Sequence, residues 1–359
     1  MNIADTRATA LRILVVRNDK LGDFMLAWPA FALIKRYLPE AQVAALVPEY
    51  TAPMARLCPF IDEVLLDERS NGARELARQL RKERFDVLLT LFSTSRVAMA
   101  GWLAGIRYRL APATKIAQLF YNQRLTQRRS RSQKPEYAYN LDLVWRMLAD
   151  HGVINSFTMT QEQDGDWLPP EITRPLLRFS DDRRLMKQAF YERNGVEISR
   201  KLVFIHAGSG GSATNLHPEQ YAQLANLLSH DNALAFVISA GPGEGAVARN
   251  VANAINAPAV IYEAAGLAEF AHTLQLADLF ISGSTGPLHI AGALDRPTAA
   301  FYPGHRSATP LRWQTLNAPA QRLAFTPPAG ADQHAVAAID IEAAAHTIRD
   351  HFFATTAAR

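Results

Sequence analysis

Short apolar runs alternate with amphipathic segments along the first part of the chain. The apolar runs include "RILVV", "QVAALV" and "DVLLTLF", and the segments between them include "FMLAWPAFALIKRYL" and "ARELARQLRKERF". Near-continuous apolar strands that alternate with helices predict a parallel sheet with helices on both faces. The alternation then lapses through a basic region, and a helix is expected again over "EYAYNLDLVWRMLADHG".

The same alternation begins again near residue 200, with strands expected at "KLVFIHAG", "ALAFVIS", "DLFISG" and "RPTAAFYPG". The polar, proline-bearing stretch "TMTQEQDGDWLPPEITRP" is expected to link the two halves. We therefore expect an α/β chain with a first domain over residues 1–165, a linker over 166–180, a second domain over 181–340 and a closing helix over 341–359. If two such domains face each other, the carboxyl ends of both sheets meet at a shared cleft, where ligands usually bind.

The length and composition suit a globular protein of two domains. The chain has 359 residues, of which 48% are hydrophobic and 20% are charged. No apolar run reaches the roughly 18 residues of a membrane-spanning helix, and the apolar core near the N-terminus is too short for a secretory signal. The single cysteine, Cys58, cannot form an internal disulfide, in agreement with a reducing compartment. We expect a cytoplasmic protein.

Basic residues are concentrated in the first half of the chain. Residues 1–150 contain 23 Lys and Arg against 15 Asp and Glu, whereas the remainder contains 15 against 19. Residues 107–134 contain eight basic residues and no acid. Such a run is either a solvated face or a surface that binds a polyanion, and the sequence leaves both open. The polyanion would be nucleic acid, an anionic membrane or a phosphorylated substrate.

Three glycine-rich loops of the second half follow predicted strands and precede predicted helices. They are "HAGSGGSATNLHPEQY", "SAGPGEGA" and "ISGSTGPLHIAGAL". Each is also what a tight strand-to-helix turn requires, but all three belong at one sheet edge, where backbone N–H groups and helix starts bind phosphate. Together with the basic first half they favour a diphosphate-bearing ligand. The first βα unit lacks the G-x-G-x-x-G fingerprint, which disfavours a nicotinamide or flavin cofactor.

No metal site and no bound cofactor are expected. The histidines occur singly, without the spacing that places two ligands on one helix face. His289 lies four residues after Thr285 and would either contact a ligand or pack in the interior. The acidic pair at Asp164 and Asp166 lies in the linker and is expected to form a turn, and the G-x-S-x-G order of serine hydrolases is absent.

A single acid, Asp23, lies between the first predicted strand and its helix in "RNDKLGDFMLAWPA". An aspartate at a helix start is favourable as a cap without any further function. Alternatively, Asp23 is a base that removes a proton from a substrate hydroxyl. The two roles compete, because a capping acid has a lowered pKa and is a weaker base. Opposite a diphosphate-binding edge, Asp23 is the best candidate for the base.

Three stretches, in their order and spacing, resemble the heptosyltransferases of glycosyltransferase family 9, which build the inner core of lipopolysaccharide. They are "ILVVRNDKLGDFMLAWPAFALIKRYLPEAQV", "FIHAGSGGSATNLHPEQYAQLANLL" and "ISGSTGPLHIAGALDRPTAAFYPG". The resemblance implies a GT-B fold of two Rossmann-like domains, with the acceptor on the first and the nucleotide sugar on the second. It also implies an inverting, metal-independent transfer of L-glycero-D-manno-heptose from ADP-heptose to a Kdo sugar of lipid A. The "HAGSGGSATNL" variant is most similar to the heptosyltransferase I-like branch, which acts on phosphorylated Kdo.

The resemblance also assigns roles to individual residues. Asp23 matches the catalytic aspartate of the family, and Arg17 falls where members often carry a cation. The implied donor-binding residues are Ser209, Gly210, Ser212, Asn215, Glu244, Ser284, Thr285, Gly286 and His289. The implied acceptor-binding residues are Arg17, Lys20, Arg107, Arg109, Lys115, Arg124, Arg128 and Arg129.

Two positions depart from the family pattern. Asn215 stands where members commonly carry a lysine, and Ser284 stands where many carry an aspartate. Both positions would contact the donor, so the leaving diphosphate needs its stabilising charge from another cation. Lys20, Arg306 and Arg312 are the candidates.

The resemblance gives the basic region a partner. Kdo-lipid A is an anionic amphiphile of the inner leaflet, so the arginines would hold its phosphates and place the enzyme on the cytoplasmic face of the inner membrane. No nucleic acid is expected, because the basic residues are not interleaved with aromatic ones and no helix-turn-helix pattern occurs. Two alternatives stay open: a family 9 relative that transfers another sugar or heptosylates a protein, and a module that binds nucleotide sugars without catalysis.

Overall fold

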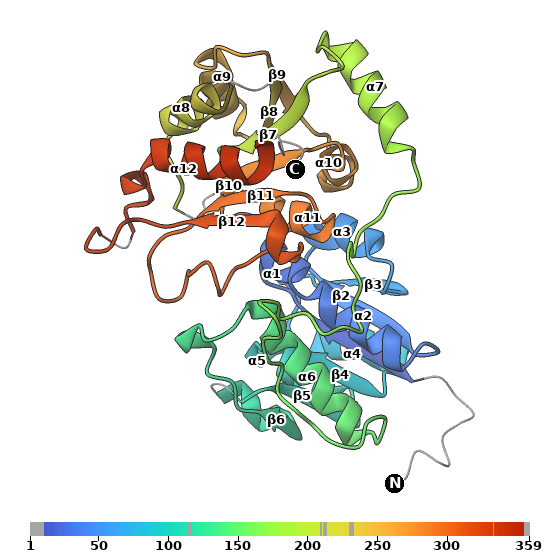
Figure 1. Ribbon diagram of the computed structural model, residues 1–359. Helices are drawn as coiled ribbons and strands as arrows, with labels where there is room; N and C mark the ends of the chain where they lie inside the picture. The colour runs from blue at the N-terminus through green and yellow to red at the C-terminus, as the bar shows by residue number, and fades with distance from the viewer. Residues whose placement is uncertain are drawn as a thin grey trace. The chain divides into compact units, whose positions relative to one another are not determined.

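The computed structural model describes residues 11–113, 116–208, 210, 214–229, 233–332 and 334–354 of the chain. These residues form two compact units that divide after Leu177, and each unit is built on a parallel sheet of six strands. Figure 1 shows each sheet with helices packed around it. The α/β class predicted from the alternation is confirmed. The domain boundaries drawn from the sequence stay a prediction, and the observed division falls within residues 166–180.

The sheet of the first unit has the strand order β3-β2-β1-β4-β5-β6. Its strands are β1 (Arg12–Val16), β2 (Gln42–Val47), β3 (Glu63–Leu66), β4 (Val87–Thr90), β5 (Tyr108–Pro112) and β6 (Gln123–Leu125). Its helices are α1 (Leu21–Met25), α2 (Trp28–Tyr37), α3 (Ala52–Leu57), α4 (Ala73–Glu83), α5 (Ser95–Leu103) and α6 (Glu136–Asp150), with 3-10 turns η2 (Glu49–Thr51), η3 (Ile116–Phe120) and η4 (Arg129–Arg131). The order reverses at β1, which pairs with both β2 and β4. The segment after β1 therefore lies at the switch point where open α/β sheets bind ligands.

The second unit repeats this arrangement, with the order β12-β11-β10-β7-β8-β9. Its strands are β7 (Lys201–His206), β8 (Leu234–Ala240), β9 (Ala259–Glu263), β10 (Leu279–Gly283), β11 (Thr298–Phe301) and β12 (Arg322–Phe325). Its helices are α7 (Arg183–Asn194), α8 (Pro218–Ser229), α9 (Gly245–Asn253), α10 (Leu267–Leu274), α11 (Gly286–Ala293) and α12 (Ile341–Ile348), with short turns η5 (Pro319–Gln321), η6 (Val336–Ala338) and the π-helical η7 (Arg349–Phe353). The switch point lies between β7 and β10, so the loops after these two strands flank it.

Burial follows the apolar pattern of the sequence. Four of the five residues of β1 and all five of β10 are buried, and both strands lie inside their sheets. Polar side chains close several helix starts: Thr94, Asp182 and Asp340 each accept a backbone N–H of the first helical turn. Among the residues that the structure describes, no helix is both long enough and apolar enough to cross a membrane.

The basic region is more regular than its sequence pattern indicates. Residues 107–134 contain β5 and β6, which complete the first sheet, together with η3 and η4. The hydrophobic pattern misses these strands because they are short and carry arginines. β6 has three residues and forms the edge of the sheet, where charged side chains are well tolerated.

Gly292 on α11 lies so close to a neighbouring segment that a side chain has no room. An added Cβ atom would lie 2.8 Å from the Cβ of Thr315 and 2.9 Å from the backbone nitrogen of Leu316. Gly292→Ala should therefore lower the free energy of unfolding by about 1–3 kcal/mol, the usual cost of overpacking. Thermal melting against the wild type measures the change. An unchanged melting temperature in Gly292→Ala would contradict this packing.

Candidate active site

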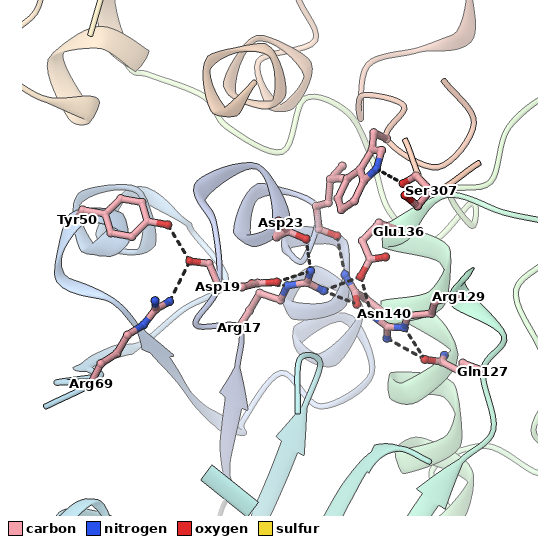
Figure 2. Close-up of polar contacts among 12 residues, drawn as sticks. Arg17, Asp19, Asp23, Tyr50, Arg69, Gln127, Arg129, Glu136, Asn140 and Ser307 are labelled. Atoms are coloured by element: carbon pink, nitrogen blue, oxygen red, sulfur yellow. Dashed lines mark hydrogen bonds and ion pairs between the residues drawn. The ribbon is translucent and has the colours of Figure 1, made fainter. Parts of the chain in front are cut away.

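A buried arginine lies where β1 opens into α1. Arg17 is only 2% exposed, and its guanidinium bonds three carboxylates (Figure 2). Nε and Nη2 each donate to one oxygen of Asp19 at 2.8 Å. Nη1 donates to Glu136 at 2.7 Å, and Nη2 also donates to Asp23. Burial alone would lower the pKa of Arg17, but the three negative charges outweigh it and hold this pKa above its usual range.

Asp23 lies in the first turn of α1 but does not cap that helix. The N-cap residue is Lys20, which makes no capping bond through its side chain. The carboxylate of Asp23 accepts a hydrogen bond from Arg17 instead. The bond to Arg17 differs from the capping interpretation drawn from the sequence, and the catalytic interpretation stays a prediction.

The surroundings of Asp23 make its carboxylate a base near neutral pH. Burial raises the pKa of Asp23, the attraction of Arg17 lowers it, and the negative charges of Asp19 and Glu136 raise it, so that it moves from 3.8 to about 7. The side chain keeps 14% of its surface exposed, so a substrate hydroxyl can reach it. A carboxylate with this pKa accepts a proton near pH 7 far more readily than an ordinary aspartate does.

Two residues of α6 complete the cluster, and neither was predicted from the sequence. Glu136 is 1% exposed and accepts a second hydrogen bond from Arg129 at 2.5 Å. Asn140 accepts from Arg17 at 3.3 Å and donates to the carbonyl of Leu26 at 3.1 Å. Glu136 is the first acid after the basic run, and this position was the sequence feature that could have indicated a partner for the arginines. Its partner lies 119 residues earlier in the chain, so local patterns cannot pair them.

Side chains from other segments of the first unit bond the loop that carries Arg17. Asn18 donates to Asp67 at 2.6 Å, and the hydroxyl of Tyr50 donates to the carbonyl of Asp19 at 2.7 Å. These contacts hold the two residues that follow Arg17, on the segment that leads to Asp23. The position of Asp23 is therefore set by the fold, which is what a preorganised catalytic group requires.

In the second unit, Glu244 joins two of the loops that the sequence singled out. Its Oε1 accepts the backbone N–H of Gly210 at 2.8 Å, and its Oε2 accepts that of Gly241 at 2.9 Å. His206, at the end of β7, places Nε2 3.5 Å from the same carboxylate. Burial lowers the pKa of His206 and the charge of Glu244 opposes this, with a net shift downward. His206 was not predicted, although its place directly before the glycine-rich loop was a usable signal.

The start of α11 carries two buried polar atoms without a partner. Thr285 is the N-cap residue and is 3% exposed, yet its Oγ1 makes no hydrogen bond within the described structure. His289 is 2% exposed, and its Nδ1 also has no partner there. Burial lowers the pKa of His289 to about 4, so its ring is neutral at pH 7. Unpaired buried polar atoms at a helix start indicate a place for an anionic or hydroxyl-bearing ligand.

Asn215 is engaged within the loop that follows β7. Its Nδ2 donates to the carbonyls of Ala207 at 2.8 Å and Gly208 at 3.3 Å, and its Oδ1 accepts from the hydroxyl of Tyr221. These contacts give Asn215 a part in shaping the loop at the position where the family commonly has a lysine. Gly286 is the first residue of α11, directly after Ser284 and Thr285. Of the other predicted donor residues, those outside the described part of the chain are Ser209 and Ser212.

The cations expected to bind acceptor or diphosphate differ in their exposure. Arg109 donates to the carbonyls of Ile106 and Phe120, and Arg129 donates to Gln127 as well as to Glu136, so both serve contacts inside the first unit. Those exposed to solvent are Lys20, Arg107, Arg124, Arg128 and Arg306. Arg312 is 8% exposed, with its guanidinium 5.4 Å from the ring centre of Trp313. Lys115 lies outside the described residues.

Known proteins identify the family of this chain. The family model described as "Glycosyltransferase family 9 (heptosyltransferase)" matches residues 73–339. The chain belongs to glycosyltransferase family 9. One relative in Haemophilus influenzae, whose name gives the class glycosyltransferase and no substrate, is 45% identical over 326 residues, covering 89% of this chain and 90% of that protein. The lipopolysaccharide heptosyltransferase 2 of Salmonella typhimurium is 22% identical over 306 residues, covering 81% of this chain and 82% of that protein.

Solved family 9 structures share the fold. The structure of Escherichia coli heptosyltransferase WaaC with ADP-2-deoxy-2-fluoro heptose matches with a TM-score of 0.67 at 16% identity, covering 95% of this chain and 99% of that chain. The likeness confirms the GT-B fold, and the family match confirms that the chain is a glycosyltransferase. Within the described part of this family 9 chain, no group of three or more His, Cys, Asp or Glu is placed to hold a metal ion.

Arg17 should be a main support of the first unit in this family 9 glycosyltransferase. Its removal leaves the buried Glu136 and the largely buried Asp19 and Asp23 around the space of their shared partner. We expect Arg17→Met to lower the free energy of unfolding by about 3–5 kcal/mol, the usual cost of removing one partner of a buried ion pair. Urea unfolding followed by tryptophan fluorescence measures the loss, with the exposed Arg124→Met as control. If both variants unfold at the wild-type urea concentration, the cluster does not support the unit.

Proposed function

We propose that this chain is an inverting, metal-independent heptosyltransferase of lipopolysaccharide synthesis. It would transfer L-glycero-D-manno-heptose from ADP-heptose to a Kdo sugar of lipid A in the inner core. One observation carries the proposal: the partly exposed carboxylate of Asp23, at the switch point of the first sheet, with a pKa of about 7. The heptosyltransferases among its relatives support the choice of sugar.

Asp23 is the general base of the proposed reaction. A sugar hydroxyl is a weak nucleophile at neutral pH, and it becomes stronger when a carboxylate removes its proton during attack on the anomeric carbon. The new glycosidic bond forms as the bond to ADP breaks on the opposite face, so the configuration inverts. Arg17, expected from the sequence to bind the acceptor, instead positions Asp23 in this mechanism, because its donors are engaged by carboxylates.

The donor would bind at the start of α11 and at the loop after β7. The leaving ADP gains negative charge, which the backbone N–H groups of Gly286 and Leu288 and the hydroxyl of Thr285 would stabilise without a metal. The neutral ring of His289 offers to a phosphate or a ribose hydroxyl a nitrogen that has no partner among the described residues. The ADP-heptose analogue named with E. coli WaaC supports a nucleotide sugar as donor here. Lys20 and Arg306, both exposed, are the proposed sources of additional positive charge.

Glu244 would shape the donor site and contact the ribose. Both of its oxygens already hold backbone N–H groups, and a carboxylate oxygen has a second lone pair for a hydroxyl. A ribose hydroxyl that donates to Glu244 would thus be fixed relative to the glycine loops.

The acceptor would bind to the first unit, which is the role proposed for residues 1–165, and the donor to residues 181–340. The exposed side chains of Lys20, Arg107, Arg124 and Arg128 offer charge to the phosphates of a phosphorylated Kdo-lipid A, the acceptor of the heptosyltransferase I-like branch. Because this acceptor belongs to the inner membrane, the enzyme would act as a peripheral protein on the cytoplasmic face.

A panel of nucleotide sugars tests the proposed function. The purified chain is incubated with each sugar and either Kdo-lipid A or a protein acceptor, and the product mass is measured. We expect ADP-heptose to be consumed and Kdo-lipid A to gain one heptose. Transfer of another sugar, or transfer to the protein, would establish the corresponding alternative. Binding of nucleotide sugars without turnover of any pair would indicate a non-catalytic module.

Asp23→Asn should abolish most transfer while the fold persists. The amide cannot accept the proton, and the loss of a general base typically reduces rate by about 100-fold to 10,000-fold. Initial rates of ADP release measure this, while titration calorimetry should show ADP binding within a few-fold of wild type. Glu40→Gln, an exposed acid of the same unit, is the control. Near-normal rates in Asp23→Asn, or rates lost only through unfolding, would restore a structural role for this acid.

Thr285→Val should weaken ADP binding without lowering the free energy of unfolding. Replacing an unpaired buried hydroxyl with a methyl group of the same shape should leave the unliganded protein as stable or more stable. If the hydroxyl bonds the diphosphate, its loss should weaken ADP binding by about 10-fold to 100-fold, the scale of a hydrogen bond to a charged group. Calorimetry and thermal melting measure the pair of effects, with the exposed Thr347→Val as control. Unchanged ADP affinity would place the diphosphate elsewhere.

A further inference from the structure

Four large apolar side chains are exposed on one part of the first unit. Met99 and Trp102 lie on α5 and are 36% and 54% exposed, whereas Ile116 and Leu119 lie on η3 and are 75% and 74% exposed. Such side chains are normally buried, so a group of them at the surface indicates a binding face. We call Met99, Trp102, Ile116 and Leu119 the apolar face.

The apolar face is a fixed part of the fold. α5 and η3 pack against each other, and the ring centres of Trp102 and Phe120 lie 5.9 Å apart. The Nε of Arg109, on β5, donates to the carbonyl of Phe120 at 2.9 Å and so ties η3 to the sheet. The four side chains are therefore presented together and do not belong to an unattached loop.

The surroundings of the apolar face are strongly basic. Residues 87–135 contain nine Lys and Arg and no Asp or Glu. On α4, which packs beside α5, Arg81 donates to the carbonyl of Leu103 at 2.5 Å. The acids of α4 are Glu75, which pairs with Arg78, and Glu83, which pairs with Arg12. The exposed cations of these segments are Arg74, Arg78, Arg81, Lys82, Arg107, Arg124, Arg128 and Arg131. Apolar side chains that enter a bilayer interface, bordered by cations that meet its phosphates, are typical of proteins that bind anionic membranes.

We propose that the apolar face docks this enzyme on an anionic lipid surface. Met99, Trp102, Ile116 and Leu119 enter the interface between headgroups and acyl chains, and the surrounding arginines contact lipid phosphates. The inference rests on the membrane-borne acceptor of the proposed function, but not on which sugar is transferred. It identifies the docking residues, which the basic run of the sequence did not.

Charge argues against a second copy of the chain as the occupant. A symmetric dimer places the same patch of both subunits together. The basic border of one copy would then meet the basic border of the other, and its exposed cations outnumber Glu75 and Glu83 of α4. Like charges brought together at an interface are unfavourable, whereas an anionic leaflet complements the border throughout.

Binding to vesicles tests the proposal. The full chain is sedimented with vesicles of phosphatidylethanolamine and phosphatidylglycerol, and separately with vesicles of phosphatidylcholine alone. We expect binding to the anionic vesicles that weakens with salt, and at least tenfold weaker partitioning of the double variant Ile116→Ser/Leu119→Ser. Leu185→Ser/Ile198→Ser, with side chains 60% and 66% exposed on the second unit, is the matched control and should bind as wild type. Equal partitioning of both double variants would overturn the proposal.

Two further measurements distinguish insertion into lipid from self-association of the chain. Brominated lipids should quench tryptophan fluorescence in the wild type and much less in Trp102→Phe, and equal quenching in both would overturn the insertion of this residue. Sedimentation velocity without lipid should show one species for the wild type and for Ile116→Ser/Leu119→Ser. A wild-type dimer that the variant dissociates would make the face a subunit interface instead.

An activity measurement keeps the proposed function distinct from the docking proposal. With a deacylated, water-soluble Kdo acceptor, Ile116→Ser/Leu119→Ser should transfer heptose at the wild-type rate, because only the lipid surface is missing. No transfer by the wild type to any acceptor would contradict the proposed function, while vesicle binding would still decide the docking proposal. Loss of transfer to the soluble acceptor in the folded variant would place these residues in the acceptor site and overturn the docking role.

Discussion

The first unit depends on the guanidinium of Arg17, which forms ion pairs with three carboxylates. Arg17 lies at the end of the central strand β1, and its guanidinium joins that strand to α1 through Asp23 and to α6 through Glu136. Buried carboxylates repel one another, and one guanidinium cannot neutralise all three. Asp19 and Asp23 each keep 14% of the side chain exposed, whereas Glu136 keeps 1%. Burial raises the pKa of Asp23, the attraction of Arg17 lowers it, and the charges of Asp19 and Glu136 raise it, so that it lies at about 7. The cluster that ties three elements together thus also holds Asp23 among the surroundings that raise its pKa.

The second unit presents hydrogen-bond donors, in contrast to the carboxylates of the first unit. Its glycine-rich loops are drawn together by Glu244, and the start of α11 presents backbone N–H groups, the unpaired hydroxyl of Thr285 and the neutral ring of His289. Such a site favours a ligand that gains negative charge as it leaves. Under the proposed function, the first unit would supply the proton acceptor and the second unit would supply donors for the departing diphosphate.

Local patterns in the sequence predicted the α/β class, the position of Asp23 and the glycine loops, because strand burial and strand-to-helix turns are short-range properties. The short arginine-bearing strands β5 and β6 were missed, since their hydrophobic signal is weak. The charge pattern also could not distinguish the exposed arginines from Arg129, whose guanidinium donates hydrogen bonds to Gln127 and Glu136. Contacts across more than a hundred residues, such as that of Glu136 with Arg17, follow only from the strand order.

The pH dependence of kcat/KM in wild type and Glu136→Gln tests this account most directly. The base must be deprotonated, so the wild-type value should rise with pH through about 7 and then level. Glu136→Gln removes one negative charge and frees Arg17 to interact more strongly with Asp23, and both changes lower the pKa of Asp23. The rising limb should therefore move to lower pH. If kcat/KM rises over the same pH range in both proteins, Glu136 does not influence the pKa of Asp23. A wild-type kcat/KM that does not rise near pH 7 would also contradict the role of Asp23 as a base.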